Sequence, residues 1–219
     1  MPNEQDITHS YIIDFVRSSL APNSDFLLEL EDYAHKNGVP IVQKEVASFL
    51  KVLCMTHKPK NVLEIGTAIG YSSILMLEAL APDAHITTIE RDENMTQIAR
   101  KNIEKAGYSD RIDVLSADAE VLLPALDGAY DMVFMDGAKA HYIHFLPHCV
   151  RLLKKDGLLI SDNILYGGMV TNRALLIRRK ITIVKRLKKY IDALCNDERF
   201  VTSLLSIGDG VSVLYKKHD

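Results

Sequence analysis

The chain has few cysteines and no long apolar run. Its three thiols, Cys54, Cys149 and Cys195, are widely separated in a sequence of 219 residues. An odd, sparse set of cysteines argues against a disulfide framework and a cysteine-ligated zinc, and is typical of a reducing compartment. No segment approaches about 18 uninterrupted apolar residues, so we expect no membrane span. The N-terminus lacks the basic and apolar pattern of a signal peptide, so we expect a cytoplasmic protein.

The charges are unevenly distributed. The net charge is −3, from 26 basic and 29 acidic residues, but residues 171–190 hold eight basic residues and no acidic one. That leaves 18 basic residues against 29 acidic ones elsewhere, so the local charge is more informative than the average. A chain with 47% apolar and 25% charged residues suits one globular domain, which we expect to span residues 1–219.

Residues 60–72 combine a buried strand with a glycine turn. Val62, Leu63 and Ile65 form a short apolar run, Gly66 and Gly70 follow, and a helical apolar pattern comes next. Such a turn brings backbone N–H groups and a helix N-terminus close to a ligand. The spacing is not the Gly-x-Gly-x-x-Gly of dinucleotide sites, which argues against a nicotinamide dehydrogenase. A glycine turn without a ligand is the alternative.

Glu90 ends the next apolar run, about one strand–helix–strand unit later. A carboxylate at this position can accept hydrogen bonds from both hydroxyls of a ribose. The glycine turn and Glu90 together therefore indicate a cofactor that contains a nucleoside.

Strands and helices alternate after residue 60. We expect strands at 60–65, 85–89, 111–115, 130–135 and 157–161, and helices between them at 71–81, 92–106, 118–126 and 139–153. Alternation with short connections predicts a parallel sheet covered on both faces. Helices at 5–20, 25–37 and 44–56 come first and are expected to cover the cofactor site, a partner subunit or the sheet edge. A helix at 172–195 and an antiparallel hairpin of 199–206 and 211–216 come last. The expected fold class is α/β, with a seven-stranded, mostly parallel sheet.

An acidic residue lies at or near the C-terminal end of each expected parallel strand. These residues are Glu64, Glu90, Asp118, Asp136 and Asp162. Any one of them could simply cap a helix, but ligands of such sheets bind beyond these ends, so five acids there indicate a shared site.

Asp136, Asp162 and Asn163 are oxygen donors of the kind that magnesium prefers, although Asp162 and Asn163 could instead cap the next segment. Lys139 follows Asp136 closely, and partial burial beside a cation would favour its neutral amine, so it is a candidate general base. His141, His144 and His148 share a helix face, but histidines in helices are usually structural or solvated, so we do not expect a zinc site.

The motif Leu-Glu-Ile-Gly-Thr-Ala-Ile-Gly-Tyr-Ser-Ser, residues 63–73, resembles the first motif of class I S-adenosylmethionine-dependent methyltransferases. With Phe-Met-Asp-Gly-Ala-Lys, residues 134–139, and the pair Asp162-Asn163, the chain resembles the cation-dependent O-methyltransferases of the catechol and caffeoyl-CoA group, from about residue 38 to the C-terminus. The resemblance implies Mg²⁺ or Mn²⁺ on Asp136, Asp162 and Asn163, with Lys139 as the base. It implies S-adenosylmethionine contacts at Val39, Glu64, Gly66, Thr67, Tyr71, Ser72, Glu90, Asp118, Ala119 and Asp136. The bacterial members of this group imply a homodimer.

The basic segment suggests the substrate. Single-sign clusters on an acidic protein are typical of a polyanion partner, and Arg178, Arg179, Lys180, Lys185 and Arg186 are the candidate contacts. The stretch also resembles the bacterial tRNA 5-hydroxyuridine methyltransferases of this family. It implies conversion of 5-hydroxyuridine in the tRNA anticodon loop to 5-methoxyuridine. A small catechol-type diol or a caffeoyl-CoA-like substrate is the alternative.

Overall fold

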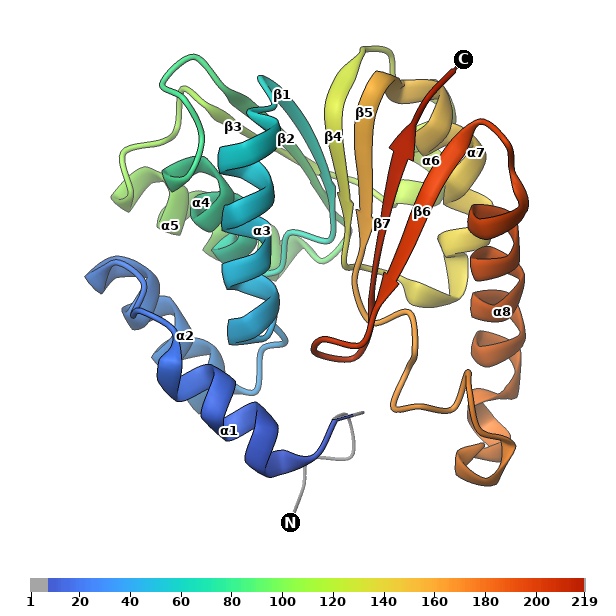
Figure 1. Ribbon diagram of the computed structural model, residues 1–219. Coiled ribbons are helices and arrows are strands. Elements are labelled where there is room, and N and C mark those ends of the chain that lie inside the picture. Colours follow the sequence, from blue (N-terminus) through green and yellow to red (C-terminus); the bar gives the residue numbers. More distant parts are fainter. Residues whose placement is uncertain (1–7, 219) are drawn as a thin grey trace.

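A single seven-stranded sheet organises the computed structural model, which describes residues 8–218 (Figure 1). The strand order is β3-β2-β1-β4-β5-β7-β6; β1 to β5 run parallel, and β7 pairs antiparallel with both β5 and β6. The strands are β1 Asn61–Ile65, β2 His85–Glu90, β3 Ile112–Ser116, β4 Tyr130–Met135, β5 Leu153–Ser161, β6 Phe200–Leu205 and β7 Val211–Lys216. The predicted fold class is confirmed, including the C-terminal hairpin.

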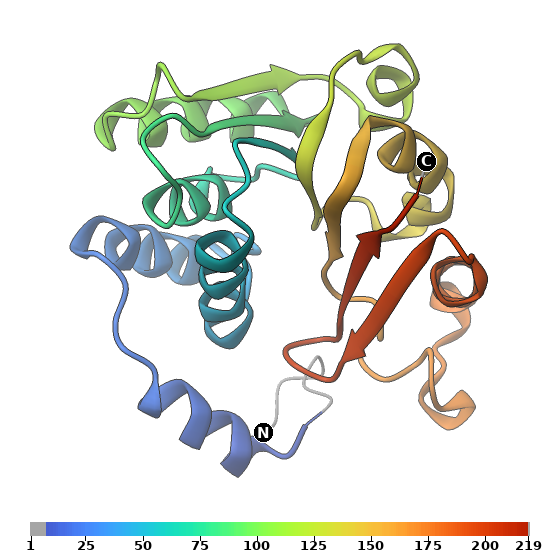
Figure 2. The ribbon, with the colours of Figure 1, turned by 45° about the horizontal axis from the view of Figure 1, so that its top comes forward.

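Helices cover both faces of the sheet, and each face has its own apolar cluster (Figure 2). One cluster includes side chains of α2 to α5 and the other includes side chains of α6 to α8. The helices are α1 Ser10–Ser19, α2 Asp25–Asn37, α3 Lys44–His57, α4 Tyr71–Glu78, α5 Glu93–Lys105, α6 Ala119–Ala125, α7 Tyr142–Leu152 and α8 Ile181–Asn196. Residues 5–7 of the expected first helix lie outside the described residues. Among residues 8–218, no helix has the length and apolar content needed to cross a bilayer.

Strand β1 lies inside the sheet, between β2 and β4. Val62, Leu63, Glu64 and Ile65 are all buried, as the apolar run predicts except for the glutamate. The chain winds outward from β1 in both directions, so β1 and β4 flank the point where the strand order reverses. Ligands of open α/β sheets bind in the crevice at this point.

The predicted long helix at 172–195 is wrong over residues 172–180. Helix α8 begins at Ile181, and residues 172–180 form two 3-10 turns, Arg173–Leu175 and Arg178–Lys180. The side chain of Asn172 accepts a hydrogen bond from the Ala174 N–H at 2.9 Å, a local bond that competes with helix formation. Ile177 is 47% exposed and lies in an extended link between the two turns.

The segment around β5 also differs from expectation. The expected helix at 139–153 is a 3-10 turn, η1 Lys139–His141, followed by α7, and β5 begins at Leu153 rather than at residue 157. The ladder with β4 changes register between Tyr130 and Met132, and Asp156 takes a left-handed conformation. A β-bulge of this kind lengthens one strand relative to its partner and leaves no alternating pattern to read in the sequence.

Candidate active site

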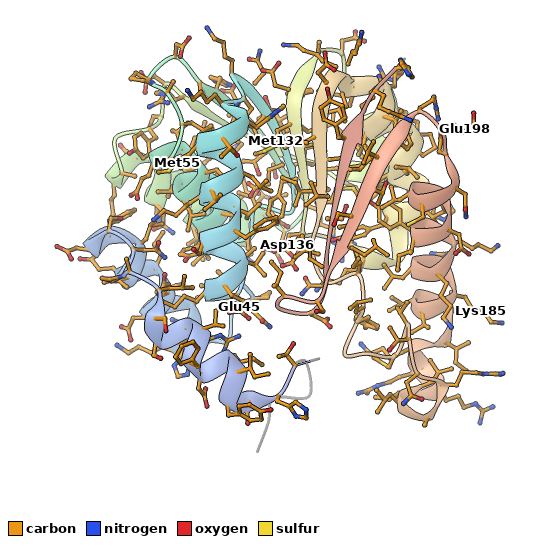
Figure 3. All side chains as sticks on the ribbon, viewed as in Figure 1. Glu45, Met55, Met132, Asp136, Lys185 and Glu198 are labelled. Carbon is orange, nitrogen blue, oxygen red and sulfur yellow. The ribbon has the colours of Figure 1, made fainter. Side chains whose placement is uncertain are left out.

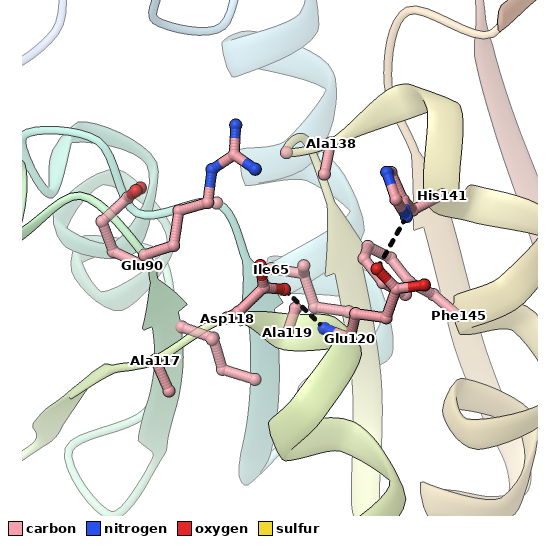
Figure 4. A pocket seen from close by; sticks show the side chains of 13 residues that line it. Ile65, Glu90, Ala117, Asp118, Ala119, Glu120, Ala138, His141 and Phe145 are labelled. Carbon is pink, nitrogen blue, oxygen red and sulfur yellow. Dashed lines mark hydrogen bonds and ion pairs between the residues drawn. The ribbon is translucent and has the colours of Figure 1, made fainter.

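A cleft opens where β1, β2 and β3 end, and it is lined partly by the segments that follow β3 and β4 (Figure 4). Four residues predicted to contact a cofactor line this cleft: Gly66, Glu90, Asp118 and Ala119. These four strand-end residues therefore line a cavity at the crevice where ligands of this fold bind.

The floor of the cleft depends on a close approach of two glycines. Gly66 has a φ of +101°, and a Cβ added to it would lie 2.7 Å from the backbone nitrogen of Gly137. The Gly66 N–H donates to the Ile89 carbonyl at 2.9 Å, and the Asp136 N–H donates to the Ile65 carbonyl at 3.0 Å. These bonds hold the ends of β1, β2 and β4 together, so that the turn after β1 faces the cleft.

Glu90 and Asp118 are oriented by backbone N–H groups. Glu90 accepts from the N–H of Ala68 at 3.0 Å with one oxygen and from the N–H of Asp92 at 2.9 Å with the other. Asp118 caps α6 by accepting from the Glu120 N–H at 2.8 Å. A carboxylate has about four acceptor positions, so both side chains keep capacity for a ligand.

Glu64 lies beneath the turn rather than in the cleft lining. It is fully buried and accepts hydrogen bonds from Ser72 at 2.5 Å, from Thr88 at 2.6 Å and from Ser73. Thr67 extends the network to Thr88 at 2.6 Å. Burial raises the pKa of Glu64, and the three hydroxyl bonds oppose that rise. Glu64, Thr67 and Ser72 thus brace the glycine turn from within the protein.

Val39 and Tyr71 line a second cavity, open to solvent, beside helices α1 and α2. The Tyr71 hydroxyl donates to Glu31 at 2.7 Å and accepts from Asn23 at 3.1 Å. Tyr71 therefore ties the start of α4 to the N-terminal helices, and these two predicted cofactor residues are not among those lining the first cleft.

Asp136, Asp162 and Asn163 are brought together at the ends of β4 and β5; Figure 3 shows Asp136 at this edge of the sheet. The Asn163 N–H donates to the Asp162 carboxylate at 2.7 Å. Burial raises the pKa of Asp136 to about 6, against the pull of the Lys139 cation. Burial, and then the charge of Asp136, raises the pKa of Asp162 well above its usual value. Two neighbouring carboxylates with raised pKa values and an amide oxygen are a donor set that a hard divalent cation would stabilise.

The three histidines of η1 and α7 differ in their surroundings. His141 faces Glu120, with 3.2 Å between Nδ1 and Oε2, whereas His144 is exposed and His148 is half-buried. Within residues 8–218, no three or more His, Cys, Asp and Glu side chains are grouped so as to hold a metal.

The basic residues divide into two groups. Arg178, Arg179 and Lys185 are exposed, and Figure 3 shows Lys185 pointing away from α8 into solvent. Lys180 instead bonds the Tyr166 hydroxyl at 2.5 Å and lies 4.9 Å from the centre of its ring. Arg186 donates to the Ala140 carbonyl at 3.2 Å, which places this end of α8 against the turn that carries Lys139.

Sequence reasoning missed four cleft residues that carry polar or aromatic side chains: Arg91, Glu120, His141 and Phe145. Arg91 directly follows Glu90, and Glu120 directly follows Ala119. Their positions next to predicted site residues could therefore have indicated that they line the cleft. His141 and Phe145 enter the cleft through the packing of η1 and α7, which no local pattern reveals.

Solved structures share this fold over almost the whole chain. A protein from Staphylococcus aureus assigned as a caffeoyl-CoA O-methyltransferase has 35% sequence identity and a TM-score of 0.84, over 94% of this chain and 97% of that one. An O-methyltransferase from Bacillus cereus, solved in complex with SAH, has 25% identity and a TM-score of 0.83, over 94% of this chain and 97% of that one. The fold and its cleft thus define a class I methyltransferase.

The family model for O-methyltransferases matches residues 17–217. A catechol O-methyltransferase from Niastella koreensis is 31% identical over 162 residues, which are 71% of this chain and 73% of that protein. The chain therefore belongs to the S-adenosylmethionine-dependent O-methyltransferase family.

Proposed function

We propose that the protein transfers the methyl group of S-adenosylmethionine to the 5-hydroxyl of 5-hydroxyuridine in the tRNA anticodon loop, giving 5-methoxyuridine. Membership of the O-methyltransferase family supports transfer of a methyl group to an oxygen. The observation that carries the choice of substrate is the basic segment, whose exposed Arg178, Arg179 and Lys185 lie on and before the helix that contacts the Lys139 turn.

The cleft supports binding of the nucleoside part of the cofactor. Glu90 is oriented by two backbone N–H groups and has acceptor capacity left for the ribose hydroxyls. Asp118 and Ala119, at the start of α6, would flank the adenine, and Gly66 lets the backbone approach the ligand closely. Glu64, Thr67 and Ser72 would act from beneath by holding the glycine turn in shape. Val39 and Tyr71 would contribute from the N-terminal side.

Asp136, Asp162 and Asn163 would hold Mg²⁺ or Mn²⁺. The fit rests on their chemistry: two carboxylates that burial and mutual repulsion leave poorly stabilised as anions, next to an amide. A divalent cation at this position, when bound, would lower the pKa of a coordinated hydroxyl and orient two vicinal substrate oxygens. In 5-hydroxyuridine the 5-hydroxyl and the 4-carbonyl provide such a pair.

Lys139 would serve the proton transfer. It is half-buried at the start of η1, and its charge acts on both Asp136 and Asp162. In its neutral form the Lys139 amine would accept the proton of the substrate hydroxyl and become an ammonium, as the oxygen bonds to the methyl carbon and the carbon–sulfur bond breaks. The rest of the catalytic contribution is positioning, because in-line displacement requires the oxygen near the methyl group and aligned with that bond.

The second candidate substrate is a small catechol-type diol or a caffeoyl-CoA-like ester. The relatives from Niastella koreensis and Staphylococcus aureus bear the names of such enzymes. The two candidates need the same donor set for vicinal oxygens. Use of the basic segment separates tRNA from a small uncharged diol, whereas the phosphates of a CoA ester could also use that segment.

The test compares the two substrates on one charge-removal variant. Arg178, Arg179 and Lys185 are replaced by Ala, while Arg186 is kept because it bonds the Ala140 carbonyl. Activity on hydroxylated tRNA should fall far more than activity on a catechol, with a flatter salt dependence. A control that removes the exposed Lys101, Lys105 and Lys155 should change neither activity. Absence of 5-methoxyuridine on hydroxylated tRNA, or equal losses on both substrates, would refute the tRNA assignment.

A further inference from the structure

Glu120 and His141 approach each other across the cleft. Nδ1 of His141 lies 3.2 Å from Oε2 of Glu120, and both residues line the cavity (Figure 4). Glu120 belongs to the first turn of α6, and His141 ends the η1 turn that begins at Lys139. This contact therefore links the wall that follows β3 to the wall that follows β4.

The rest of the η1 turn is also fixed from outside. The His141 ring stacks on Phe145, with 5.9 Å between ring centres and 27° between planes, and Phe145 is buried. Arg186 donates to the carbonyl of Ala140 at 3.2 Å. The turn starts after Ala138 in a left-handed conformation and closes with the His141 N–H donating to the Ala138 carbonyl at 2.7 Å. The His141 ring also lies 6.1 Å from the ring of His144, centre to centre, and Glu120 is its contact from the wall that follows β3.

We propose that Glu120 and His141 form a positioning pair, which couples filling of the cleft to the placement of Lys139. This inference rests on the proposed function, in which the adenine lies against the start of α6 and Lys139 receives the substrate proton. Neither residue of the pair touches the reacting atoms; both act through Lys139.

The physical basis is the difference in mobility before and after ligand binding. The Glu120 side chain is 55% exposed and retains freedom in the open cleft, whereas the His141 side chain is 34% exposed and stacks on Phe145. A nucleoside seated beside Asp118 and Ala119 restricts Glu120, and the contact passes that restriction to His141, two residues from Lys139. Partly exposed pairs stabilise a fold little, so the effect should appear in placement rather than in folding.

The first test measures Lys139 directly, without turnover. Reductive methylation with labelled formaldehyde, followed by peptide mass spectrometry, gives the labelling rate of Lys139 with and without S-adenosylhomocysteine. We expect that the ligand slows labelling in the wild-type protein. Glu120→Ala and His141→Ala should each lose most of this protection, while calorimetry shows ligand affinity within about threefold of wild type, as suits a weak, partly exposed contact.

The second test uses kinetics. Either substitution should lower kcat about tenfold, because small displacements of a catalytic group are costly, and the double variant should fall no further than a single one. His141→Gln keeps a donor facing Glu120 and should recover part of kcat. The matched control is the His85–Asp113 contact between β2 and β3, at 3.5 Å, whose removal should change neither protection nor kcat.

The outcomes separate the inference from the proposed function. Wild-type protein that neither binds S-adenosylhomocysteine nor transfers a methyl group would refute the proposed function. Wild-type protein that does both, with Lys139 protection unchanged in the variants or with additive losses of kcat, would refute the positioning pair alone.

Discussion

Gly66 and Gly137 touch through their backbones where β1 and β4 end. A Cβ on Gly66 would lie 2.7 Å from the Gly137 nitrogen, and a Cβ on Gly137 would lie 2.9 Å from the Gly66 Cα. Both positions therefore exclude any side chain for the same reason. The contact sets how closely the turn after β1 approaches the segment that carries Asp136 and Lys139.

Gly66→Ala should destabilise the protein by about 2–5 kcal/mol, since it combines a positive φ with a clash against backbone. The control is Gly107→Ala, where φ is +76° but nothing lies within 4 Å of the added Cβ, so only about 1–2 kcal/mol should be lost. Urea unfolding of both variants measures the difference. Equal losses would contradict the backbone contact.

Glu90→Ala should weaken S-adenosylmethionine binding by about 1.5–3 kcal/mol, because it removes charge-assisted bonds to the ribose. Isothermal calorimetry gives the dissociation constant, and Glu93→Ala, an exposed acid on α5, is the control. A thermal melt checks that loss of the Ala68 and Asp92 bonds leaves the fold intact. Unchanged affinity would remove Glu90 from the cofactor site.

Chelation should abolish methyl transfer, and Mg²⁺ or Mn²⁺ should restore it, if Asp136, Asp162 and Asn163 hold the cation. Asp162→Ala should lose turnover while still binding S-adenosylmethionine. Turnover is followed by product formation on either substrate, and binding by calorimetry. Full activity in excess EDTA is the result that would exclude these three residues from catalysis.

Asp131 should make stability depend on pH under acid conditions. Burial of the Asp131 carboxylate raises its pKa. The carboxylate also accepts hydrogen bonds from Lys154 at 2.7 Å, from the Asn61 N–H at 2.8 Å and from the Lys60 N–H at 2.9 Å. These bonds outweigh the effect of burial, so the pKa of Asp131 is lowered below 3.8. The folded state therefore binds its proton less readily than the unfolded state. The resulting stabilisation is complete above the unfolded pKa and is lost as pH falls through the folded pKa.

Asp131→Asn should accordingly reduce the free energy of unfolding by about 1–3 kcal/mol at neutral pH, and the gap from wild type should shrink below about pH 4. Urea titrations at a series of pH values measure both. If the difference in free energy of unfolding between wild type and variant stays constant through the acid range, the destabilisation does not come from the charge of Asp131.

The exposed aromatic side chains of α1 lead us to expect self-association. Tyr11 and Phe15 lie four residues apart on α1 and are 69% and 72% exposed. Adjacent exposed aromatic residues are typical of an interface, so we expect a homodimer. Light scattering at micromolar concentration should show twice the chain mass, and Phe15→Glu should give a monomer. Val121→Glu, at a 76% exposed position on α6, should not. A monomeric wild type would refute the expectation.

Local patterns predicted most of the fold. The apolar run before Gly66 and the strand-end acids specified β1, the glycine turn and the edge where Asp136 and Asp162 lie, because each depends on a few adjacent residues. The start of α8 was not predictable in this way, because a side-chain bond from Asn172 and extended residues at Leu176 and Ile177 interrupt an apparently helical pattern.

The contact of Glu120 with His141 was equally hidden. The two residues are separated by strand β4, and their meeting depends on how α6 and η1 pack over the sheet. Likewise, nothing in the sequence shows that Lys180 is held by Tyr166 while Arg178 remains exposed. Such pairings follow from tertiary packing, which periodicity and spacing do not encode.

The place of β7 in the sheet has a consequence for the order of folding. β6 is synthesised before β7, yet it joins the sheet only through β7, which inserts between it and β5. β6 therefore has no strand to pair with in the sheet until the segment Val211–Lys216 is in place. Until then β5 is also an open edge, exposed to pairing with other chains. A change that prevents β7 from pairing should therefore favour aggregation, because it leaves β5 and β6 unpaired at the same time.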